Sequence, residues 1–280
     1  MDDNDPVPQA LDEFGQQQAD AAAPLRPHVI HEVVREEGEA ELRRAALSLA
    51  LSGFAAGLSM GFSFLTLSLL RAGLPDAPWH RLVDSFGYSL GFVIVILGRQ
   101  QLFTESTLTA VLPVLTSRTL RTILLMLRLW GIVLASNLLG TFVFAALVTP
   151  EGVFPSEVRA ALLEVGRESL SGGFGPVLLK SVFAGWLIAL MVWLLPNARQ
   201  ARLWVIILLT YVVSVGRFSH IIAGSTEAIF AVFTGGASVH DYALRFLAPT
   251  LLGNTIGGVS LVALLNHAPI AQELREVGER

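Results

Sequence analysis

Ionisable residues are scarce in the apolar stretches of this 280-residue chain, and the few that occur there are the candidates for chemistry. They are Arg99, Glu105, Lys180, Arg217, His220 and Glu227. A titratable side chain inside a membrane is costly and commonly marks an ion pathway or a proton relay. Imidazole changes its charge close to neutral pH, so His220 could donate a proton to an anion or orient a water molecule that does so.

The sequence lacks the motifs of disulfide, metal-dependent and hydrolytic chemistry. The chain has no cysteine, which excludes disulfides, thiolate metal sites and cysteine nucleophiles. It has no His-Glu-x-x-His motif and no Gly-x-Ser-x-Gly elbow, so we do not expect an enzyme. His28 and His31 stand three residues apart without an evident third ligand, which favours a solvated pair over a metal site. We expect no metal and no cofactor.

Composition predicts an integral membrane protein. Apolar residues make up 53% of the chain and charged residues 15%, and the mean hydropathy is +0.61. Too few charges remain to coat a water-facing surface. Acidic residues gather near the start, where residues 1–41 hold eleven Asp and Glu against two Arg. This distribution predicts an acidic tail and no binding to nucleic acid.

The apolar runs predict an all-α protein with six transmembrane helices. Four of them are long enough to cross a bilayer: 45–70, 129–150, 246–270 and 169–198, the last interrupted only by Lys180. Two more, 86–98 and 203–216, are too short to span alone, and each is followed by polar residues and a second short apolar stretch. They predict that the second and fifth helices are broken. Irregular backbone at membrane depth is tolerated only where it is buried in protein or lines a cavity.

Arginines in the connecting segments predict the orientation of the chain. Six crossings place both termini on one side, together with Arg118, Arg121, Arg128, Arg199 and Arg202, which predicts cytoplasmic termini in an inner (plasma) membrane. We expect a disordered acidic tail at 1–29, an interfacial helix at 30–44 that leads to the membrane, a channel domain at 45–270 and a cytoplasmic tail at 271–280.

Two matched sets of residues indicate an internal repeat. Gly98-Arg99 and Gly216-Arg217 follow the two short runs, and Asn137-x-x-Gly140 resembles Asn254-x-x-Gly257. The spacing agrees, since Gly98 to Asn137 is 39 positions and Gly216 to Asn254 is 38. A duplicated unit with an odd number of spans must be inverted relative to the first, which predicts two three-helix repeats related by an axis in the membrane plane.

Four ordered motifs resemble those of the formate/nitrite transporter family. They are QLFTES (101–106), AGWLIALMVWL (184–194), FSHIIAG (218–224) and LLGNTIGG (251–258), and the similarity runs over about residues 45–266. The resemblance implies an aquaporin-like protomer, a homopentamer with one pore per protomer, and passage of small monovalent anions or their acids. It implies that His220 is the central pore histidine, Thr104 its hydrogen-bonding partner, and Leu102, Phe92 and Val213 the constriction.

The chain also departs from that family. Ser219 stands before the histidine where the family usually has Glu, and Gly185 and Gly224 stand where it has Asn. Lys180, the only lysine of the chain, lies where the family often has Arg. This lysine could line the pathway or extend to the membrane interface.

The physical chemistry favours passage as a neutral acid. An isolated small anion in a low-dielectric constriction faces a penalty of tens of kcal/mol. Protonating an acid with a pKa near 4 at pH 7 costs only about 4 kcal/mol. We expect two ion pairs, Arg99 with Glu227 and Arg217 with Glu105, to brace the helix breaks, because unpaired buried charges are costly.

Two functions fit these observations. The first is a channel or proton-coupled transporter for formate-like monovalent acids. The second is a non-conducting or differently selective membrane scaffold or sensor, whose pore is closed and whose acidic tail binds cytoplasmic partners. Retention of His220 and Thr104 favours the first function, and loss of the polar residues around His220 favours the second.

Overall fold

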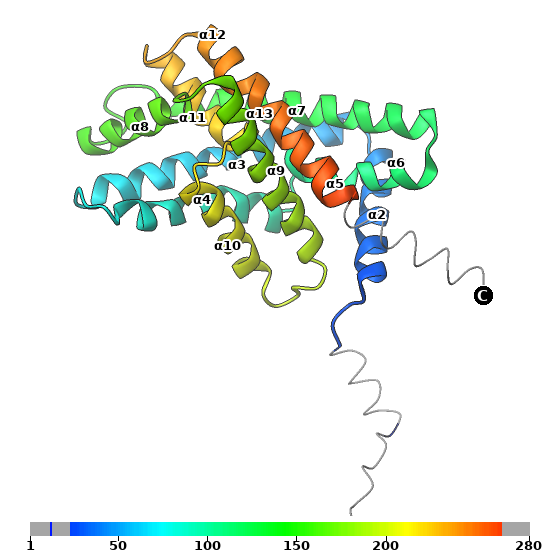
Figure 1. Cartoon of the computed structure of the whole chain (residues 1–280). Helices are drawn as coiled ribbons and strands as arrows, with labels where there is room; N and C mark the ends of the chain where they lie inside the picture. Colours follow the sequence, from blue (N-terminus) through cyan, green and yellow to red (C-terminus); the bar gives the residue numbers. More distant parts are fainter. Residues whose placement is uncertain (1–11, 13–22, 265–280) are drawn as a thin grey trace, which may run out of the picture.

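The computed structural model describes residue 12 and residues 23–264, without the side chains of 261–264. Residues 1–11 and 13–22 of the expected tail at 1–29, and the whole of the one at 271–280, therefore lie outside the described residues. The described part folds into helices (Figure 1). In chain order these are α2 (Pro27–Arg43), α3 (Ala46–Gly73), α4 (His80–Leu97), α5 (Phe103–Thr109), α6 (Val111–Ser117), α7 (Leu120–Val148), α8 (Ser156–Ser169), α9 (Phe174–Leu194), α10 (Arg202–Val215), α11 (Ile221–Phe233), α12 (Val239–Asp241), the π-helix η1 (Tyr242–Leu247), α13 (Ala248–Ile256) and the π-helix η2 (Gly257–Leu264).

Four of the described helices are long and apolar enough to cross a membrane, namely α3, α4, α7 and α9. The helices α10 and α11 are shorter and apolar. The expectation that 86–98 is too short to span was wrong, because α4 begins at His80 and has 18 residues. Its first turns are polar and still helical, since the buried Asp84 carboxylate accepts a hydrogen bond from Arg71 of α3 at 2.8 Å.

Two other predicted segments have different limits in the structure. The helix α7 begins nine residues before the apolar run 129–150, where the Thr119 hydroxyl caps it by accepting the backbone N–H of Thr122 at 3.2 Å. The apolar run 169–198 forms a shorter helix than expected. Its first residue, Ser169, ends α8, and α9 spans Phe174–Leu194. The amphipathic α8 was not predicted, and it buries Val158, Leu162 and Val165 against the bundle.

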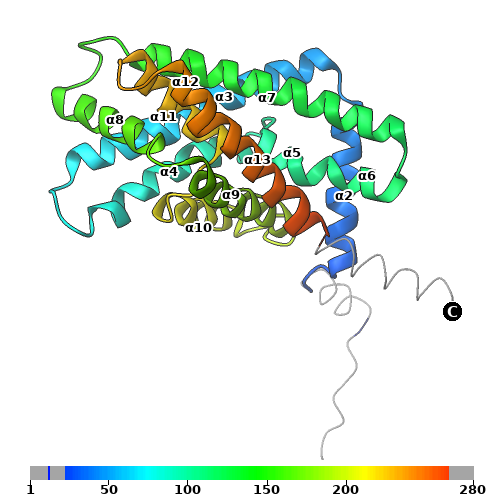
Figure 2. The same cartoon turned by 45° about the horizontal axis from the view of Figure 1, so that its top comes forward.

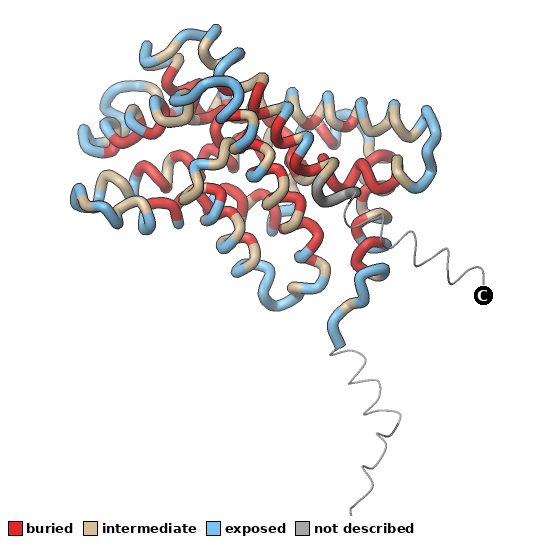
Figure 3. Tube along the Cα trace, viewed as in Figure 1, coloured by how far each residue is buried: buried red, intermediate tan, exposed pale blue. Residues whose placement is uncertain are grey.

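The long helices form a bundle with distinct elements at its two ends. The helices α3, α4 and α7 run along one another, with α8 at one end and α2 and α6 at the other (Figures 1 and 2). Buried residues gather along the middle of the bundle, whereas turns and helix ends are exposed (Figure 3). We therefore call the two ends the α8 side and the α2 side.

The helix expected at 30–44 is α2, and it is docked rather than only interfacial. It buries Ile30, His31, Val34, Gly38 and Leu42 and contacts α6, α7 and α9. A side chain at Gly38 would not fit, because a Cβ atom there would lie 2.0 Å from the Thr109 carbonyl oxygen. This close approach places α2 directly against the end of α5.

Candidate functional site

The chain breaks twice inside the bundle, and both breaks have the same backbone geometry. After α4, the Gln100 N–H bonds to the Val95 carbonyl oxygen at 2.9 Å and Arg99 has a φ of 51°. After α10, the Phe218 N–H bonds to the Val213 carbonyl oxygen at 2.9 Å and Arg217 has a φ of 53°. Both helices thus end in a Schellman motif, with arginine in the left-handed position that glycine usually occupies.

A buried asparagine holds the break after α4. The Asn137 Oδ1 accepts the backbone N–H of Phe103 at 2.9 Å. Its Nδ2 donates to the carbonyl oxygens of Gln101 at 2.9 Å and Gly53 at 2.8 Å. The amide therefore satisfies backbone groups that the interrupted helix leaves without partners, and it joins them to α3.

The Asn254 side chain makes the equivalent three bonds at the second break. Its Oδ1 accepts the N–H of Ile221 at 2.8 Å, and its Nδ2 donates to the carbonyl oxygens of Ser219 at 2.9 Å and Ser181 at 2.8 Å. The residues held between the bonded groups also match, since Leu102 has φ −111° and ψ 129° and His220 has φ −110° and ψ 127°. Leu102 and His220 thus occupy equivalent positions in the two halves.

The two breaks meet at His220. Its Nδ1 accepts the backbone N–H of Ala223 at 3.3 Å, and its Nε2 lies 2.8 Å from the Thr104 Oγ1. Because Nδ1 accepts a hydrogen bond, the proton of a neutral ring is on Nε2, and Nε2–H donates to Thr104. Phe92 contacts the imidazole edge to face, with ring centroids 4.9 Å apart.

Of the three residues expected at the constriction, Phe92 contacts His220, and all three are buried. Leu102, Phe92 and Val213 are buried, with at most 1% of their surface exposed. Val213 and His220 line a cavity on the α8 side, whereas Glu105, next to Thr104, lines a cavity on the α2 side. The Thr104–His220 bond therefore lies between the two cavities.

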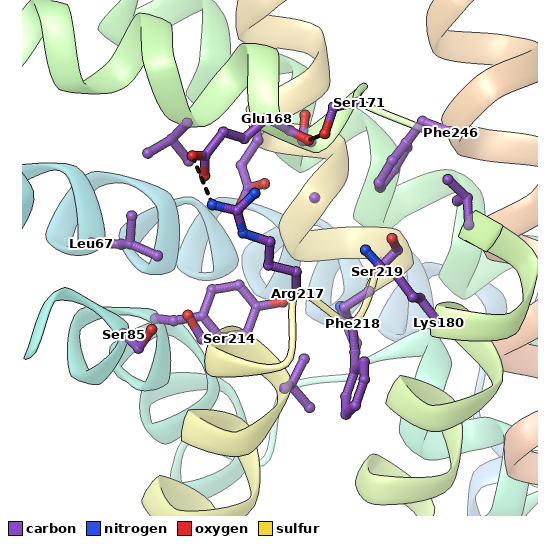
Figure 4. Close-up of a pocket in the computed structure, with 18 of the residues that line it drawn as sticks. Leu67, Ser85, Glu168, Ser171, Lys180, Ser214, Arg217, Phe218, Ser219 and Phe246 are labelled. Carbon is purple, nitrogen blue, oxygen red and sulfur yellow. Dashed lines mark hydrogen bonds and ion pairs between the residues drawn. The ribbon is translucent and has the colours of Figure 1, made fainter. Parts of the chain in front are cut away.

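The α8-side cavity has a volume of about 120 Å³, enough for several water molecules. Its charged lining residues are Arg71, Arg81, Glu168, Lys180, Arg217 and Glu227, together with His220. Lys180 of α9 and Ser219 both line this cavity, and Arg217 pairs with Glu168 (Figure 4). The structure thus brings Lys180 to the same cavity as His220.

The expected ion pairs of Arg99 with Glu227 and of Arg217 with Glu105 are wrong. The Arg99 guanidinium pairs with Glu37 at 2.8 Å, and Arg217 pairs with Glu168 at 3.1 Å. The partners come from α2 and α8, which pack over the two ends of the bundle. Each arginine shares a cavity with the acid of its own half of the chain, so the pairing does not cross between the halves.

The α2-side cavity is larger, with a volume of about 840 Å³, and is lined by Glu37, Glu41, Arg99, Glu105 and Arg202, among others. The Glu41 carboxylate accepts hydrogen bonds from the Gln101 Nε2 at 3.0 Å and the Thr109 Oγ1 at 2.7 Å. Burial raises the pKa of this carboxyl above its usual value. Glu41 therefore joins α2 to both ends of the segment that carries Thr104.

Sequence reasoning missed the charged network at the mouth of the α8-side cavity. Arg71 contacts Asp84 at 2.8 Å, Glu164 at 3.3 Å and Glu168 at 3.3 Å. Glu168 therefore bridges Arg71 and Arg217. The only signal for this network in the sequence was the presence of charged residues next to apolar runs. Two of its acids, Glu164 and Glu168, lie on α8, which was not predicted.

The two N-terminal histidines do not form a solvated pair. His31 is buried, with its ring centroid 6.3 Å from that of Trp193. Within residues 23–264, no three His, Asp or Glu side chains are grouped as a metal site would require.

Sequence comparison identifies a matching family and relatives among known membrane and transport proteins. A family model described as formate/nitrite transporter matches residues 28–268. The chain is 41% identical over 251 residues to the inner membrane protein YfdC of Escherichia coli (strain K12), covering 90% of this chain and 81% of that protein. It is 24% identical over 234 residues to a probable formate transporter of Methanothermobacter thermautotrophicus, covering 76% and 85%.

Solved structures show the same fold. An FNT family ion channel matches with a TM-score of 0.77 at 19% identity, covering 86% of this chain and 99% of that one. A pentameric formate channel with formate bound matches with a TM-score of 0.67 at 22% identity, covering 80% and 96%. The described helices therefore adopt the fold of these channels.

Proposed function

The chain belongs to the formate/nitrite transporter family, and from this premise we propose that it conducts small monovalent anions, such as formate or nitrite, as their neutral acids. The observation that carries the proposal is the 2.8 Å bond between Thr104 and His220, between two cavities lined by charged residues. The Nε2–H of His220 and the Thr104 hydroxyl are the polar groups in a proposed apolar constriction made by Leu102, Phe92 and Val213.

The cost of desolvation determines the form in which the substrate crosses. Moving a bare anion past buried apolar side chains costs far more than the roughly 4 kcal/mol needed to protonate a formate-like acid at pH 7. Lys180 and Arg217 attract the anion into the α8-side cavity. Protonation near His220 then removes the charge, and the neutral acid exchanges hydrogen bonds with the Thr104–His220 pair as it passes.

We also propose that the two halves are inverted three-helix repeats. The equal Schellman endings and the equal bonds of Asn137 and Asn254 support this symmetry. A repeat with an odd number of spans reverses its direction in the membrane. The proposed assembly is a homopentamer with cytoplasmic termini, which mass determination in detergent and a protease-accessible tag at each terminus would test.

Transport by proteoliposomes tests the function. We expect the purified protein to take up formate, and an inward proton gradient to accelerate uptake. His220→Ala should abolish most of this uptake, because it removes both the Nε2–H donor and the ring that Phe92 contacts. His240→Ala is the matched control, since His240 is exposed in the short helix α12 before η1 and should leave uptake unchanged.

Three results would contradict the proposal. Uptake that is equal in wild type and His220→Ala would remove the histidine from the mechanism. Uptake that is indifferent to the proton gradient would exclude passage as the acid. Absence of uptake of formate, nitrite and related monovalent anions by wild-type protein would instead support the non-conducting scaffold or sensor.

A further inference from the structure

Two carboxyl groups in the membrane region have no bonding partner. Among the described residues, neither Glu105 nor Glu227 forms a hydrogen bond or an ion pair, although arginines lie in the same cavities. Both side chains are half-buried and face a cavity, Glu227 on the α8 side and Glu105 on the α2 side. A carboxyl group held in a membrane without a partner is commonly part of a proton pathway.

Several of the surrounding charged groups are already bonded to other residues. On the α8 side, Arg71 and Arg217 both bond to Glu168, which leaves Glu227 unpaired. The other titratable or charged groups of that cavity are Arg81 and Tyr88 of α4, Lys180 of α9 and His220. On the α2 side, the charged groups that line the cavity with Glu105 are Glu36, Glu37 and Glu41 of α2, together with Arg44, Arg99, Arg199 and Arg202. Of these, Arg99 is bonded to Glu37 and Glu41 is bonded to Gln101 and Thr109.

The histidine itself is poorly arranged to release a proton. Protonation of a neutral His220 must occur at Nδ1, and this atom already accepts the Ala223 N–H. A proton on Nδ1 would point at the Ala223 N–H. Charging the ring therefore requires breaking the hydrogen bond by which His220 caps α11. His220 is thus arranged as a hydrogen-bond donor through Nε2, and the proton that neutralises the substrate needs another source.

We propose that Glu227 and Glu105 are the proton-exchanging groups of the two cavities, an inference that rests on the proposed function. On the α8 side, the Glu227 carboxyl transfers its proton to the anion, giving the neutral acid and a Glu227 carboxylate that water in the cavity reprotonates. The acid passes the Thr104–His220 pair. On the α2 side, it returns its proton to the Glu105 carboxylate, which releases that proton to water. One proton therefore crosses with each anion, and the reverse direction uses the same steps.

Paired measurement of formate and proton uptake in proteoliposomes tests this assignment, with the protein oriented so that formate is presented on the α8 side. We expect one proton per formate in wild type. Glu227→Gln should slow formate uptake at least tenfold at pH 7, and the defect should shrink towards pH 5, where the solution itself supplies the acid. Glu105→Gln should give the larger defect when formate is presented on the α2 side, and Glu227→Asp should restore part of the rate.

Whether Glu227→Gln slows or accelerates uptake distinguishes a proton donor from a residue that acts only through its charge. Removing a negative charge from an anion pathway should accelerate uptake if Glu227 acts only through its field, whereas removing a proton donor slows it. Glu157→Gln is the matched control, because Glu157 is exposed in the first turn of α8, outside the cavity lining, and should keep the wild-type rate. Unchanged or faster uptake by Glu227→Gln, or a defect equal at all pH values, would overturn the inference alone. Wild-type protein that takes up no anion would overturn the proposed function as well.

Discussion

Removing either bracing asparagine should cost about as much stability as three interhelical hydrogen bonds. Asn137→Ala frees the Phe103 N–H and the carbonyl oxygens of Gln101 and Gly53, each bonded at 2.8 to 2.9 Å. At the average of about 0.6 kcal/mol per polar contact between transmembrane helices, the loss is about 2 kcal/mol. At about 1 kcal/mol per buried bond in soluble proteins, it is about 3 kcal/mol.

Reversible unfolding by sodium dodecyl sulfate in mixed micelles measures this free energy. We expect Asn137→Ala and Asn254→Ala to lower the free energy of unfolding by similar amounts, because the two sets of bonds are equivalent. Asn197→Ala is the control, since this exposed side chain accepts one bond, from the Leu25 N–H at 2.9 Å. A loss below about 1 kcal/mol in both buried variants would refute the view that these amides hold the breaks.

Three further changes test the site and its supports. Thr104→Val removes the hydroxyl that accepts from His220 and, under the proposed function, should slow formate uptake about fivefold to tenfold, as expected for one buried hydrogen bond, whereas Thr104→Ser should stay close to wild type. Gly185→Ala places a Cβ atom 2.3 Å from the Asn254 carbonyl oxygen and should lower the free energy of unfolding by about 1–3 kcal/mol, whereas Gly131→Ala has nothing within 4 Å and should not destabilise. Burial raises the pKa of Glu41, so docked α2 holds the proton more tightly than free α2, and docking should weaken as pH rises from the usual carboxyl range through the raised pKa. Protection factors of the α2 amides, which are corrected for the intrinsic rise of exchange with pH, should therefore fall over that window, and Glu41→Gln should remove this fall.

The parts of the fold that follow from hydrophobicity were predictable. A membrane helix needs about 20 apolar residues, so α3, α7 and α9 were located to within several residues of their centres. The limits of α4 and the existence of α8 were not predictable in this way. Asp84 is tolerated inside α4 because Arg71 from another helix pairs with it, and α8 lies at the end of the bundle as an amphipathic helix with a charged face. Both features depend on tertiary contacts that a hydropathy pattern does not contain.

The functional site, like the fold, was predictable only where local motifs determine it. The bond between Thr104 and His220 was expected from motifs that fix both residues within a few positions of a helix break, and the structure confirms it. The partners of Arg99 and Arg217 were wrong, because the expectation considered only charges within the repeats. The acids that pair with them, Glu37 of α2 and Glu168 of α8, lie on helices outside the proposed repeats, so the symmetry argument could not have identified them.

The departures around the histidine have a steric reason and an electrostatic consequence. Gly185 lies against the Asn254 backbone in α13, and a Cβ atom at Gly224 would lie 2.5 Å from the ring of the buried Phe246 in η1, so neither position has room for an asparagine unless α13 or η1 moves. The polar groups absent there cannot be restored by single reversions. An acid is also absent at Ser219, yet Glu227 projects into the same cavity from the second turn of α11. The cavity that His220 lines thus keeps one unpaired carboxyl, supplied from a different position of the chain, as the proposed transport of a protonated acid requires.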